Sequence, residues 1–310
     1  VAEAQLIGRG ARYFPFTLDI DQDKYRRKYD DAIDNDFKVL EELYYHTKDE
    51  SKYISELKKA LEHFGSTEKE EDFIPMFEAA TKEAERFFGR GDAFIEKYLS
   101  NPRHIEVQIV ADKYGNVIHL AERDCSIQRK HQKVVEIAPS PRLNDSVRKE
   151  LLRTSKKAMI KLGYESVGTV EYLVDEDDNF YFIEMNTRVQ VEHTITEAIS
   201  GVDIIYRMIR IAEGQKLPFM QEDIKFRGYA IEFRINAEDP KNGFIPSSGR
   251  ISTYLSPGGP GVRMDSIGHK DYIVPTNYDS MIGKLIVTGL DWDGVVRKSR
   301  RALDEFIIAG

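Results

Sequence analysis

Alternating strand-forming runs joined by short turns constrain the fold of this chain more than any other feature. The clearest pair lies in residues 167–185, where two such runs flank the acidic turn DEDDN. This pattern predicts an antiparallel hairpin. If its turn is centred between Asp177 and Asp178, Glu171 lies directly opposite Glu184. Opposed side chains have Cβ atoms about 4.5–5.5 Å apart, so two carboxylates there would repel each other.

A bound divalent cation would reverse that repulsion. Asn186 is two residues beyond Glu184 and therefore points to the same face of the strand. Two carboxylates and one amide oxygen suit Mg²⁺ or Mn²⁺ better than zinc, with substrate phosphates completing the octahedron. The alternative is that both glutamates are solvated on an exposed face. The hairpin thus predicts a metal site formed by Glu171, Glu184 and Asn186.

Two polar segments supply further candidate residues. In the loop TRVQVEH, Arg188 offers a forked donor for bicarbonate or phosphate, and Gln190 can donate to an oxyanion. Glu192 can act as a general base if its surroundings tune its pKa. In the segment 123–136, Lys133 is an ammonium that can reach a phosphate. Both segments are also consistent with ordinary surface loops, so these roles depend on further support.

Bulk composition excludes several classes of protein. The chain has 310 residues and a net charge of −8, which argues against binding to a nucleic-acid backbone. It contains no apolar run of about 18 residues that would span a membrane, and its first residues lack the layout of a signal peptide. The single cysteine, Cys125, excludes an internal disulfide and argues against a thiolate zinc site. These features predict a soluble protein of the cytoplasm, or of the mitochondrial matrix in a eukaryote.

The pattern along the chain predicts a mixed fold. Helical stripes run over 33–44, 54–64 and 73–87, the last ended by Gly89. From Ala93 onward we expect a hairpin over 105–122 with a turn at 113–116, a helix over 146–162 stopped by Gly163, strands over 167–174 and 179–185, a helix over 196–213, and a last helix near Trp292. The sum is an α+β (α/β) protein with largely antiparallel sheets flanked by helices.

Several long motifs occur in an order that resembles one family. They are FIEKYLSNPRHIEVQ (94–108), ERDCSIQRKHQKVVEIAPS (122–140), YFIEMNTRVQVEH (181–193), RINAEDP (234–240), PSSGRI (246–251), PGGPGVRMDS (257–266) and YDSMIGKLI (278–286). From about Glu70 to Gly310 the chain resembles the biotin carboxylase component of acetyl-CoA, propionyl-CoA and pyruvate carboxylases. The resemblance implies an ATP-grasp fold followed by a biotin carboxylase C-terminal domain.

The resemblance also implies roles for matching positions. The hinge Glu96, Lys97, Tyr98 and Leu99 would read the adenine, and the nucleoside would be held by His104, Gln128 and His131. Glu171, Glu184 and Asn186 would bind the metal ions, in agreement with the hairpin argument. Bicarbonate would be held by Lys133, Arg188, Gln190 and the backbone of Val191. Glu192 would deprotonate bicarbonate, and Arg263 would stabilise the biotin enolate.

The chemistry that the family implies is the ATP-dependent carboxylation of biotin. Bicarbonate attacks the γ-phosphate of ATP to give carboxyphosphate, which yields CO₂ and phosphate, and the biotin enolate then captures CO₂. The implied ligands are ATP, Mg²⁺ or Mn²⁺, bicarbonate, and biotin on a carrier protein. The implied partners are that carrier, a carboxyltransferase and a second copy of the chain, with no nucleic acid and no membrane. The final carboxyl acceptor stays open.

The first part of the chain departs from the family. We expect residues 1–69 to be a helical segment of unknown relation, 70–226 an ATP-grasp domain with a partial lid, and 227–310 the C-terminal domain. Only the run GRGAR near the N-terminus faintly resembles the end of a phosphate-binding glycine loop. Because much of the lid is not recognisable, we expect the chain alone to bind ATP weakly. Thr194 also stands where the family usually has proline.

Two other functions remain open at this level. One is a non-catalytic or truncated relative that keeps only a dimer or partner surface, which the unrecognised lid favours. The other is a different ATP-grasp ligase, such as an enzyme that forms carbamoyl phosphate. The complete set of base, metal and biotin residues opposes the first, and Arg263 together with the segment 123–133 favours biotin over the second.

Overall fold

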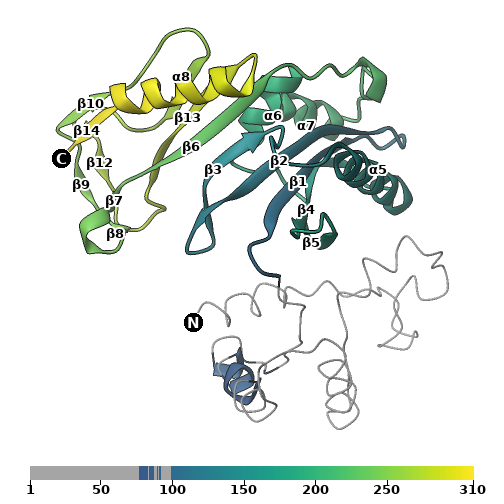
Figure 1. Ribbon diagram of the computed structural model, residues 1–310, viewed down its shortest axis with the longest axis horizontal. Helices are drawn as coiled ribbons and strands as arrows, with labels where there is room; N and C mark the ends of the chain where they lie inside the picture. Colours follow the sequence, from purple (N-terminus) through teal and green to yellow (C-terminus); the bar gives the residue numbers. More distant parts are fainter. Residues whose placement is uncertain (1–76, 83, 87–88, 90, 92–98) are drawn as a thin grey trace. The chain divides into compact units, whose positions relative to one another are not determined.

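The computed structural model describes residues 77–82, 84–86, 89, 91 and 99–310 (Figure 1). The chain divides into two compact units, Val1–Tyr98 and Leu99–Gly310. In the first unit the described residues 77–82 and 84–86 are helical, and Gly89 follows them with φ 70° while its N–H donates to Glu85 O at 2.9 Å. This confirms the predicted helix end at Gly89. The stripes predicted over 33–44 and 54–64 lie outside the described residues.

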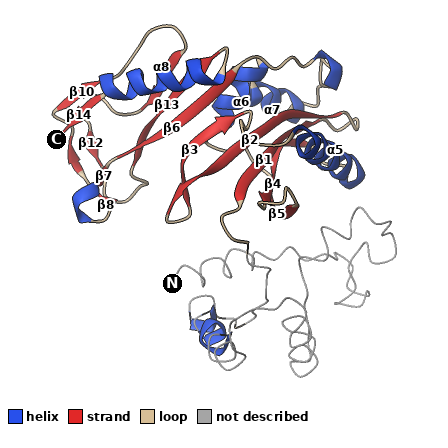
Figure 2. Cartoon of the chain, viewed as in Figure 1, coloured by secondary structure: helices blue, strands red, loops and turns tan. Residues whose placement is uncertain are grey.

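The second unit is built on one sheet of eight strands, drawn as red arrows in Figure 2. All of its strand pairs are antiparallel, which confirms the predicted fold class. In spatial order the strands are β11 (Val262–Ser266), β13 (Met281–Gly289), β6 (Tyr229–Asn236), β3 (Gln132–Ala138), β2 (Val117–Arg129), β1 (Arg103–Ala111), β4 (Ser166–Val174) and β5 (Phe180–Asn186).

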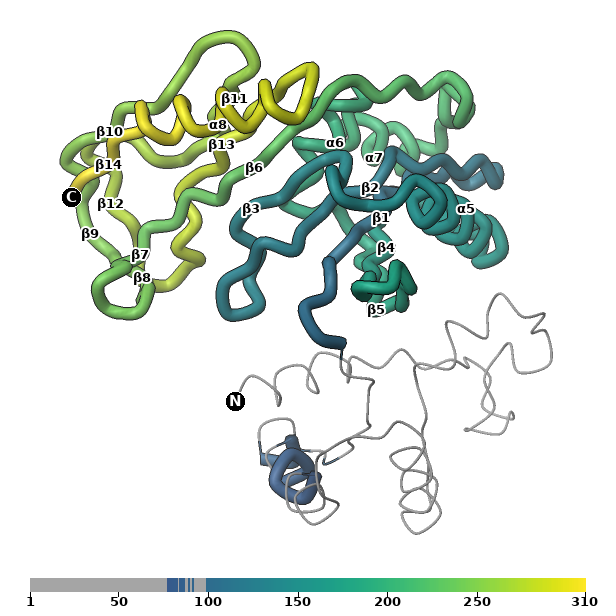
Figure 3. The backbone as a smooth tube through the Cα atoms, in the orientation of Figure 1, coloured from purple at the N-terminus to yellow at the C-terminus, as the bar shows by residue number. Residues whose placement is uncertain are grey.

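Helices cover both faces of this sheet. On β13, Ile286 packs with the helix α6 (His193–Ser200), whereas its neighbour Leu285 packs with α8 (Trp292–Glu305). Adjacent strand residues point to opposite faces, so α6 and α8 lie on opposite sides. The helix α7 (Ile204–Ala212) packs on the face of α6, and α5 (Asp145–Leu162) packs on the other face. Figure 3 traces these segments in sequence colours.

Short elements complete the C-terminal part. Three small two-stranded sheets pair β7 with β8, β9 with β12, and β10 with β14. Their bounds are β7 (Glu238–Asp239), β8 (Ile245–Pro246), β9 (Gly249–Arg250), β10 (Thr253–Leu255), β12 (Ile273–Val274) and β14 (Ile307–Ala309), and the 3₁₀ turns are η1 (Gln221–Asp223) and η2 (Pro240–Asn242). Among the described helices, none combines the length and the apolar character needed to cross a membrane.

Capping residues mark both ends of α5 and the break between α6 and α7. In α5, the Asn144 side chain accepts from Ser146 N, and Gly163 ends the helix at φ 62°, as predicted. The single helix predicted over 196–213 is wrong, because the chain forms α6 and α7 instead. Gly201 leaves the helical region at φ 70°, and Asp203 then caps α7 by accepting from Tyr206 N at 2.8 Å.

The turn of the β4–β5 hairpin differs from the predicted one. Val174 pairs with Phe180 across it, so the turn is centred on Asp177 and not between Asp177 and Asp178. The reason is local hydrogen bonding: Asp175 accepts the N–H groups of the turn through its side chain. The predicted centre was therefore wrong by half a residue.

A bulge in β5 restores the predicted pair of carboxylates. Tyr172 pairs with Phe182, but the next pair along the ladder is Glu171 with Glu184, which leaves Ile183 as an extra residue. Such a bulge shifts the pairing register by one residue and turns the side chains that follow it to the other face of the strand. The predicted opposition of Glu171 and Glu184 is confirmed, although by a route that the sequence pattern did not reveal.

Candidate functional site

A row of directly opposed charged side chains crosses the face of the sheet that α6 and α7 cover. Glu184 lies opposite Glu171, Glu171 opposite Glu106, and Glu106 opposite Arg123; we call these four residues the charged row. Like charges that face each other across strands destabilise a sheet. Three neighbouring carboxylates therefore require positive groups or hydrogen-bond donors beside them.

Asn186 joins the two carboxylates at the exposed end of the charged row. Its Nδ2 donates to Glu171 Oε1 at 2.6 Å and to Glu184 Oε1 at 3.0 Å. Turning the amide by half a revolution would exchange nitrogen for oxygen and present three oxygen ligands, a set that fits Mg²⁺ or Mn²⁺. His104 and Glu106 also bring a ligand atom within 4.8 Å of one on Glu171. The predicted metal ligands are thus in one place.

Glu171 is held as a carboxylate by its neighbours. Gln128 Nε2 donates to His104 Nδ1 at 2.8 Å, and His104 Nε2 donates to Glu171 Oε2 at 2.6 Å. Burial alone would raise the pKa of Glu171, but the hydrogen bond from His104 and the charge of Lys133 outweigh it and lower the pKa to about 2. Metal binding by a carboxylate needs this ionised form.

Glu192, the predicted base, is only 2% exposed and lies between two cations. Its Oε1 accepts from Lys133 Nζ at 2.8 Å, and its Oε2 accepts from Arg234 Nη2 at 3.0 Å. Burial opposes ionisation, yet the positive charges of Lys133, Arg123 and Arg234 lower the pKa of Glu192 to about 2. To take a proton, Glu192 therefore needs a substrate that draws one of these cations away from it.

Arg123 connects the sheet to the loop that carries Glu192. Its side chain is fully buried, and its guanidinium is paired with Glu106. Gln190 accepts from Arg123 and donates Nε2 to Glu171 Oε1 at 2.7 Å, so the loop is held at two points. The hydrogen bonds of Arg123 span 2.7–3.2 Å and reach Glu106, Gln108, Thr169, Gln190 and Thr196.

A second group of charges, two of them buried and two half-buried, lies beside Glu192 and was not predicted as part of the site. Glu136 on β3 is directly opposite Glu232 on β6, and Arg234 is directly opposite Lys284 on β13. Arg234 Nε donates to Glu136 Oε1 at 2.6 Å. The motif RINAEDP contains Arg234, but only the pairing of distant strands brings it to Glu192.

The predicted residues Arg188, Arg263 and His131 stand at the margin of this network. Arg188 is exposed and donates to Val189 O at 3.2 Å. Arg263 pairs with Asp265 at 2.7 and 2.8 Å, so the guanidinium observed next to Glu192 is that of Arg234. His131 is exposed in the β2–β3 turn at φ 61°. Their roles toward ligands stay predictions.

The remaining predicted contacts are those of the hinge with the adenine and of the Val191 backbone with bicarbonate. The Val191 carbonyl accepts from Lys284 Nζ at 2.5 Å, which fixes that part of the loop. Leu99 is partly exposed at the start of the second unit. Glu96, Lys97 and Tyr98 lie outside the described residues, so their predicted contacts with adenine stay predictions.

Cys125 lies behind the site as a buried thiol. Burial raises its pKa well above the usual value, and the charge of Glu192 adds to that effect. Its sulfur lies within 4.8 Å of a carboxylate oxygen of Glu106 and of Glu192. A thiol that keeps its proton is a poor metal ligand and a poor nucleophile, so Cys125 has a packing role here.

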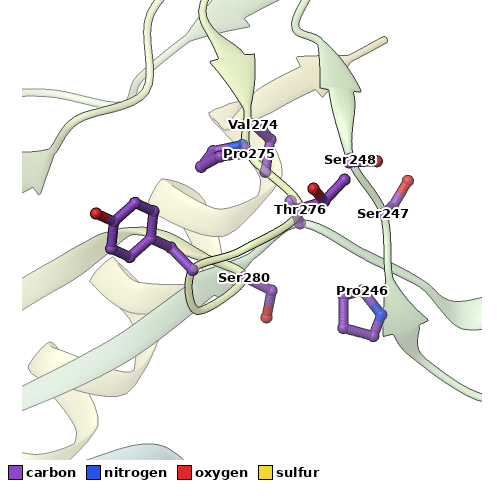
Figure 4. A pocket seen from close by; sticks show the side chains of 9 residues that line it. Pro246, Ser247, Ser248, Val274, Pro275, Thr276 and Ser280 are labelled. Atoms are coloured by element: carbon purple, nitrogen blue, oxygen red, sulfur yellow. The ribbon is translucent and has the colours of Figure 1, made fainter.

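A small pocket lies elsewhere in the second unit, between the loop after β8 and the loop after β12 (Figure 4). Its volume is about 130 Å³. Prolines and hydroxyl groups border it, and its lining includes no carboxylate or ammonium group. The residues predicted for catalysis and metal binding are absent from this lining. The candidate site is therefore the charged face of the sheet, not the pocket.

Comparison of the sequence with models of known protein families gives matches along this chain. Residues 64–220 match the model described as carbamoyl-phosphate synthase L chain, ATP binding domain, and residues 232–310 match the biotin carboxylase C-terminal domain. Residues 1–70 match a separate model described as an N-terminal region. The match over residues 64–220, together with the antiparallel sheet, defines a protein of the ATP-grasp class. With the C-terminal match, the chain belongs to the biotin carboxylase family.

Individual relatives cover the same part of the chain. Biotin carboxylase 1, chloroplastic, of Populus trichocarpa is 52% identical over 240 residues, which is 77% of this chain and 46% of that protein. The 2-oxoglutarate carboxylase small subunit of Hydrogenobacter thermophilus is 54% identical over 241 residues, 78% of this chain and 51% of that protein. The chain therefore spans about half the length of the curated relatives it matches.

Solved structures show the same likeness. A crystal structure of the biotin carboxylase domain dimer of Hydrogenobacter thermophilus 2-oxoglutarate carboxylase contains MgADP, ADP and bicarbonate. It aligns with a TM-score of 0.74 and 53% sequence identity, covering 78% of this chain and 53% of that one.

Proposed function

We propose that this chain takes part in the ATP-dependent carboxylation of biotin by bicarbonate. The observation that carries the proposal is Glu192, a buried carboxylate between Lys133 and Arg234. Beside it lies a row of carboxylates suited to a metal–nucleotide complex. Such a site can bind a small anion between two cations and remove its proton at the same point.

The first step uses the two cations of Glu192. Bicarbonate entering between Lys133 and Arg234 would compete for them and free the carboxylate to accept the bicarbonate proton. The resulting carbonate oxygen attacks the γ-phosphorus of ATP, the bond to the β-phosphate oxygen breaks, and carboxyphosphate and ADP form. Lys133 and Arg188 would offset the negative charge that builds up on the transferring group.

The second step transfers CO₂ to biotin. Carboxyphosphate releases CO₂ and phosphate, the phosphate removes the ureido proton, and the biotin enolate attacks CO₂. An enolate oxygen needs a fixed cation beside it. Arg234 is held by Glu136 and lies next to Glu192, which makes it a nearer candidate to the reacting atoms than the Arg263 of the sequence prediction.

Glu171, Glu184 and Asn186 would hold Mg²⁺ or Mn²⁺ against the nucleotide phosphates. The ion would neutralise phosphate charge during transfer. We further propose a carrier protein with biotin and a carboxyltransferase as partners, and association into a homodimer. The relatives include chloroplastic and bacterial proteins, so the predicted cytoplasmic location stays a prediction.

The test is ATP hydrolysis by the full-length protein, measured with and without bicarbonate and with and without free biotin. Hydrolysis that needs bicarbonate and rises with biotin supports the proposal. Bicarbonate-dependent hydrolysis that biotin leaves unchanged would favour the ligase that forms carbamoyl phosphate. An absence of hydrolysis, with nucleotide still bound, would favour the non-catalytic relative.

Metal binding has its own expected result. Mg²⁺ or Mn²⁺ together with ATP should raise the melting temperature, because ligand at 100 times its Kd stabilises by about 2.7 kcal/mol. Glu184→Gln should abolish the metal-dependent part of that rise, and its exposed position leaves the fold intact. Glu176→Gln, an exposed change in the turn of the same hairpin, should keep it. A melting temperature that does not change when metal is added in the presence of ATP would contradict the metal site.

A further inference from the structure

Two glutamates behind the site face each other without enough positive charge. Glu136 and Glu232 occupy directly opposed positions on β3 and β6, and both are 0% exposed. Each uses one oxygen: Glu136 Oε1 accepts from Arg234, and Glu232 Oε2 accepts from the Thr194 hydroxyl. Within the described part of the chain, Glu136 Oε2 and Glu232 Oε1 have no hydrogen-bond partner. Two bare oxygens on opposed buried carboxylates are what a single proton between them would satisfy.

We propose that Glu136 and Glu232 share one proton between these two oxygens and act as positioning residues for the loop that carries Val191 and Glu192. The role of that loop rests on the proposed function, whereas the shared proton does not.

The pair acts through two cations. Arg234 bridges Glu136 and Glu192, at 2.6 and 3.0 Å. Lys284 lies 3.9 Å from Glu232 Oε2. Its ammonium donates to the carbonyl of Val191, the residue before Glu192. Glu136 therefore binds the cation that pairs with Glu192, and Glu232 lies beside the cation that binds Val191.

The proton also sets the local charge that an anionic substrate meets. Without it, the connected carboxylates of Glu106, Glu136, Glu171, Glu192 and Glu232 carry one more charge than the cations Arg123, Lys133, Arg234 and Lys284. With it, positive and negative charges in this group balance, and bicarbonate can enter without net repulsion. The shared proton thus keeps the two cations available to both the loop and the substrate.

The surroundings place the loss of this proton near neutral pH. Burial raises the pKa of Glu136 to about 7 against the charge of Arg234, and burial raises the pKa of Glu232 to about 8 against the charge of Lys284. Other ionisable groups face the pair or lie on α6, which packs on β6: Lys133, Glu192, Arg263, Cys125, His193 and Glu197.

The sign of the pH effect follows from these directions. The folded protein keeps its proton to a higher pH than the unfolded chain, so stability falls as pH rises from the ordinary carboxyl range to about 8. Over pH 6 to 9 the protein should also lose one protonated carboxyl group. The KM for bicarbonate should then rise on the order of tenfold, because one negative charge is added near the anion.

Glu232→Gln isolates the proton. Glutamine copies the shape of the protonated acid: its carbonyl can accept from Thr194, and its amide can donate to Glu136 Oε2. In infrared difference spectra of the full-length protein between pH 6 and 9, wild type should show the carbonyl band of a protonated carboxyl disappear. The band should be absent in Glu232→Gln and in Glu136→Gln and retained in Glu176→Gln, whose side chain is exposed.

The second readout is the KM for bicarbonate over the same pH range. It should rise in wild type and stay flat in Glu232→Gln, an outcome that a purely structural role would not give. A wild-type spectrum without the band, or a Glu232→Gln variant that keeps the wild-type KM profile, overturns the inference. The infrared arm needs no turnover, so an inactive protein that shows the band would overturn the proposed function alone.

Discussion

Glu192→Gln is expected to lower turnover by at least about 100-fold, the usual scale for loss of a general base. Glutamine keeps the size of the side chain and can still accept a hydrogen bond from Lys133 or Arg234, but it cannot take the bicarbonate proton. Nucleotide binding should stay near that of wild type, because the charged row and Asn186 are unchanged. Steady-state ATP hydrolysis with bicarbonate and biotin, on the full-length protein, measures the effect.

A matched control separates the loss of the base from the loss of a charge. Glu222 is an exposed glutamate in η1, and Glu222→Gln removes one negative charge from the surface. That variant should hydrolyse ATP at the wild-type rate. If Glu192→Gln does so as well, Glu192 has no part in the chemistry and the proposed proton transfer is wrong.

Arg123→Met should have the largest effect on stability. The guanidinium is fully buried and holds Glu106 together with the side chains of Gln108 and Gln190. Methionine fills much of the same space but leaves the buried carboxylate of Glu106 with less compensation. Removing one partner of a buried ion pair costs about 3–5 kcal/mol. Urea unfolding with an unchanged slope would report this loss as a shift in midpoint.

Arg153→Met serves as the comparison for that experiment. Arg153 lies on α5, is 55% exposed in its side chain and pairs with Glu150 three residues earlier. Exposed pairs of this kind contribute about 0–1 kcal/mol. A loss of stability in Arg123→Met no greater than in Arg153→Met would show that the buried network around Arg123 does not hold the site together.

Local sequence patterns predicted much of the fold because their causes are local. Gly163 ends α5 and Gly89 follows the first-unit helix, each in the left-handed region that glycine adopts freely. The split between α6 and α7 was missed because an apolar helical stripe continues through Gly201 to α7. A glycine inside such a stripe is tolerated in many helices, so the stripe alone cannot show where the helix stops.

Strand periodicity predicted the candidate site only where its residues are close in sequence, and the family resemblance was needed to add distant residues such as Lys133 and His104. Glu171, Glu184 and Asn186 belong to one hairpin, so strand periodicity was enough to bring them together. Arg234 reaches Glu192 only because β3 pairs with β6, which joins segments almost a hundred residues apart.

The buried carboxylates were missed for a different reason. Glu136 and Glu232 are polar residues in strands, and the alternating apolar and polar pattern of a strand predicts that its polar residues face solvent. Only the packing of α6 over that face reveals that they are buried.

The continuous sheet has a consequence for how this kind of chain can be rearranged. The family models meet between residues 220 and 232, a boundary that suggests two exchangeable modules. Yet β3, from the first match, is hydrogen-bonded to β6, which leads into the second. A break at that boundary would leave two long strands with bare edges, a known route to aggregation. Recombination at the apparent seam would therefore need partners that already share this strand pairing, so the two halves are expected to be inherited together.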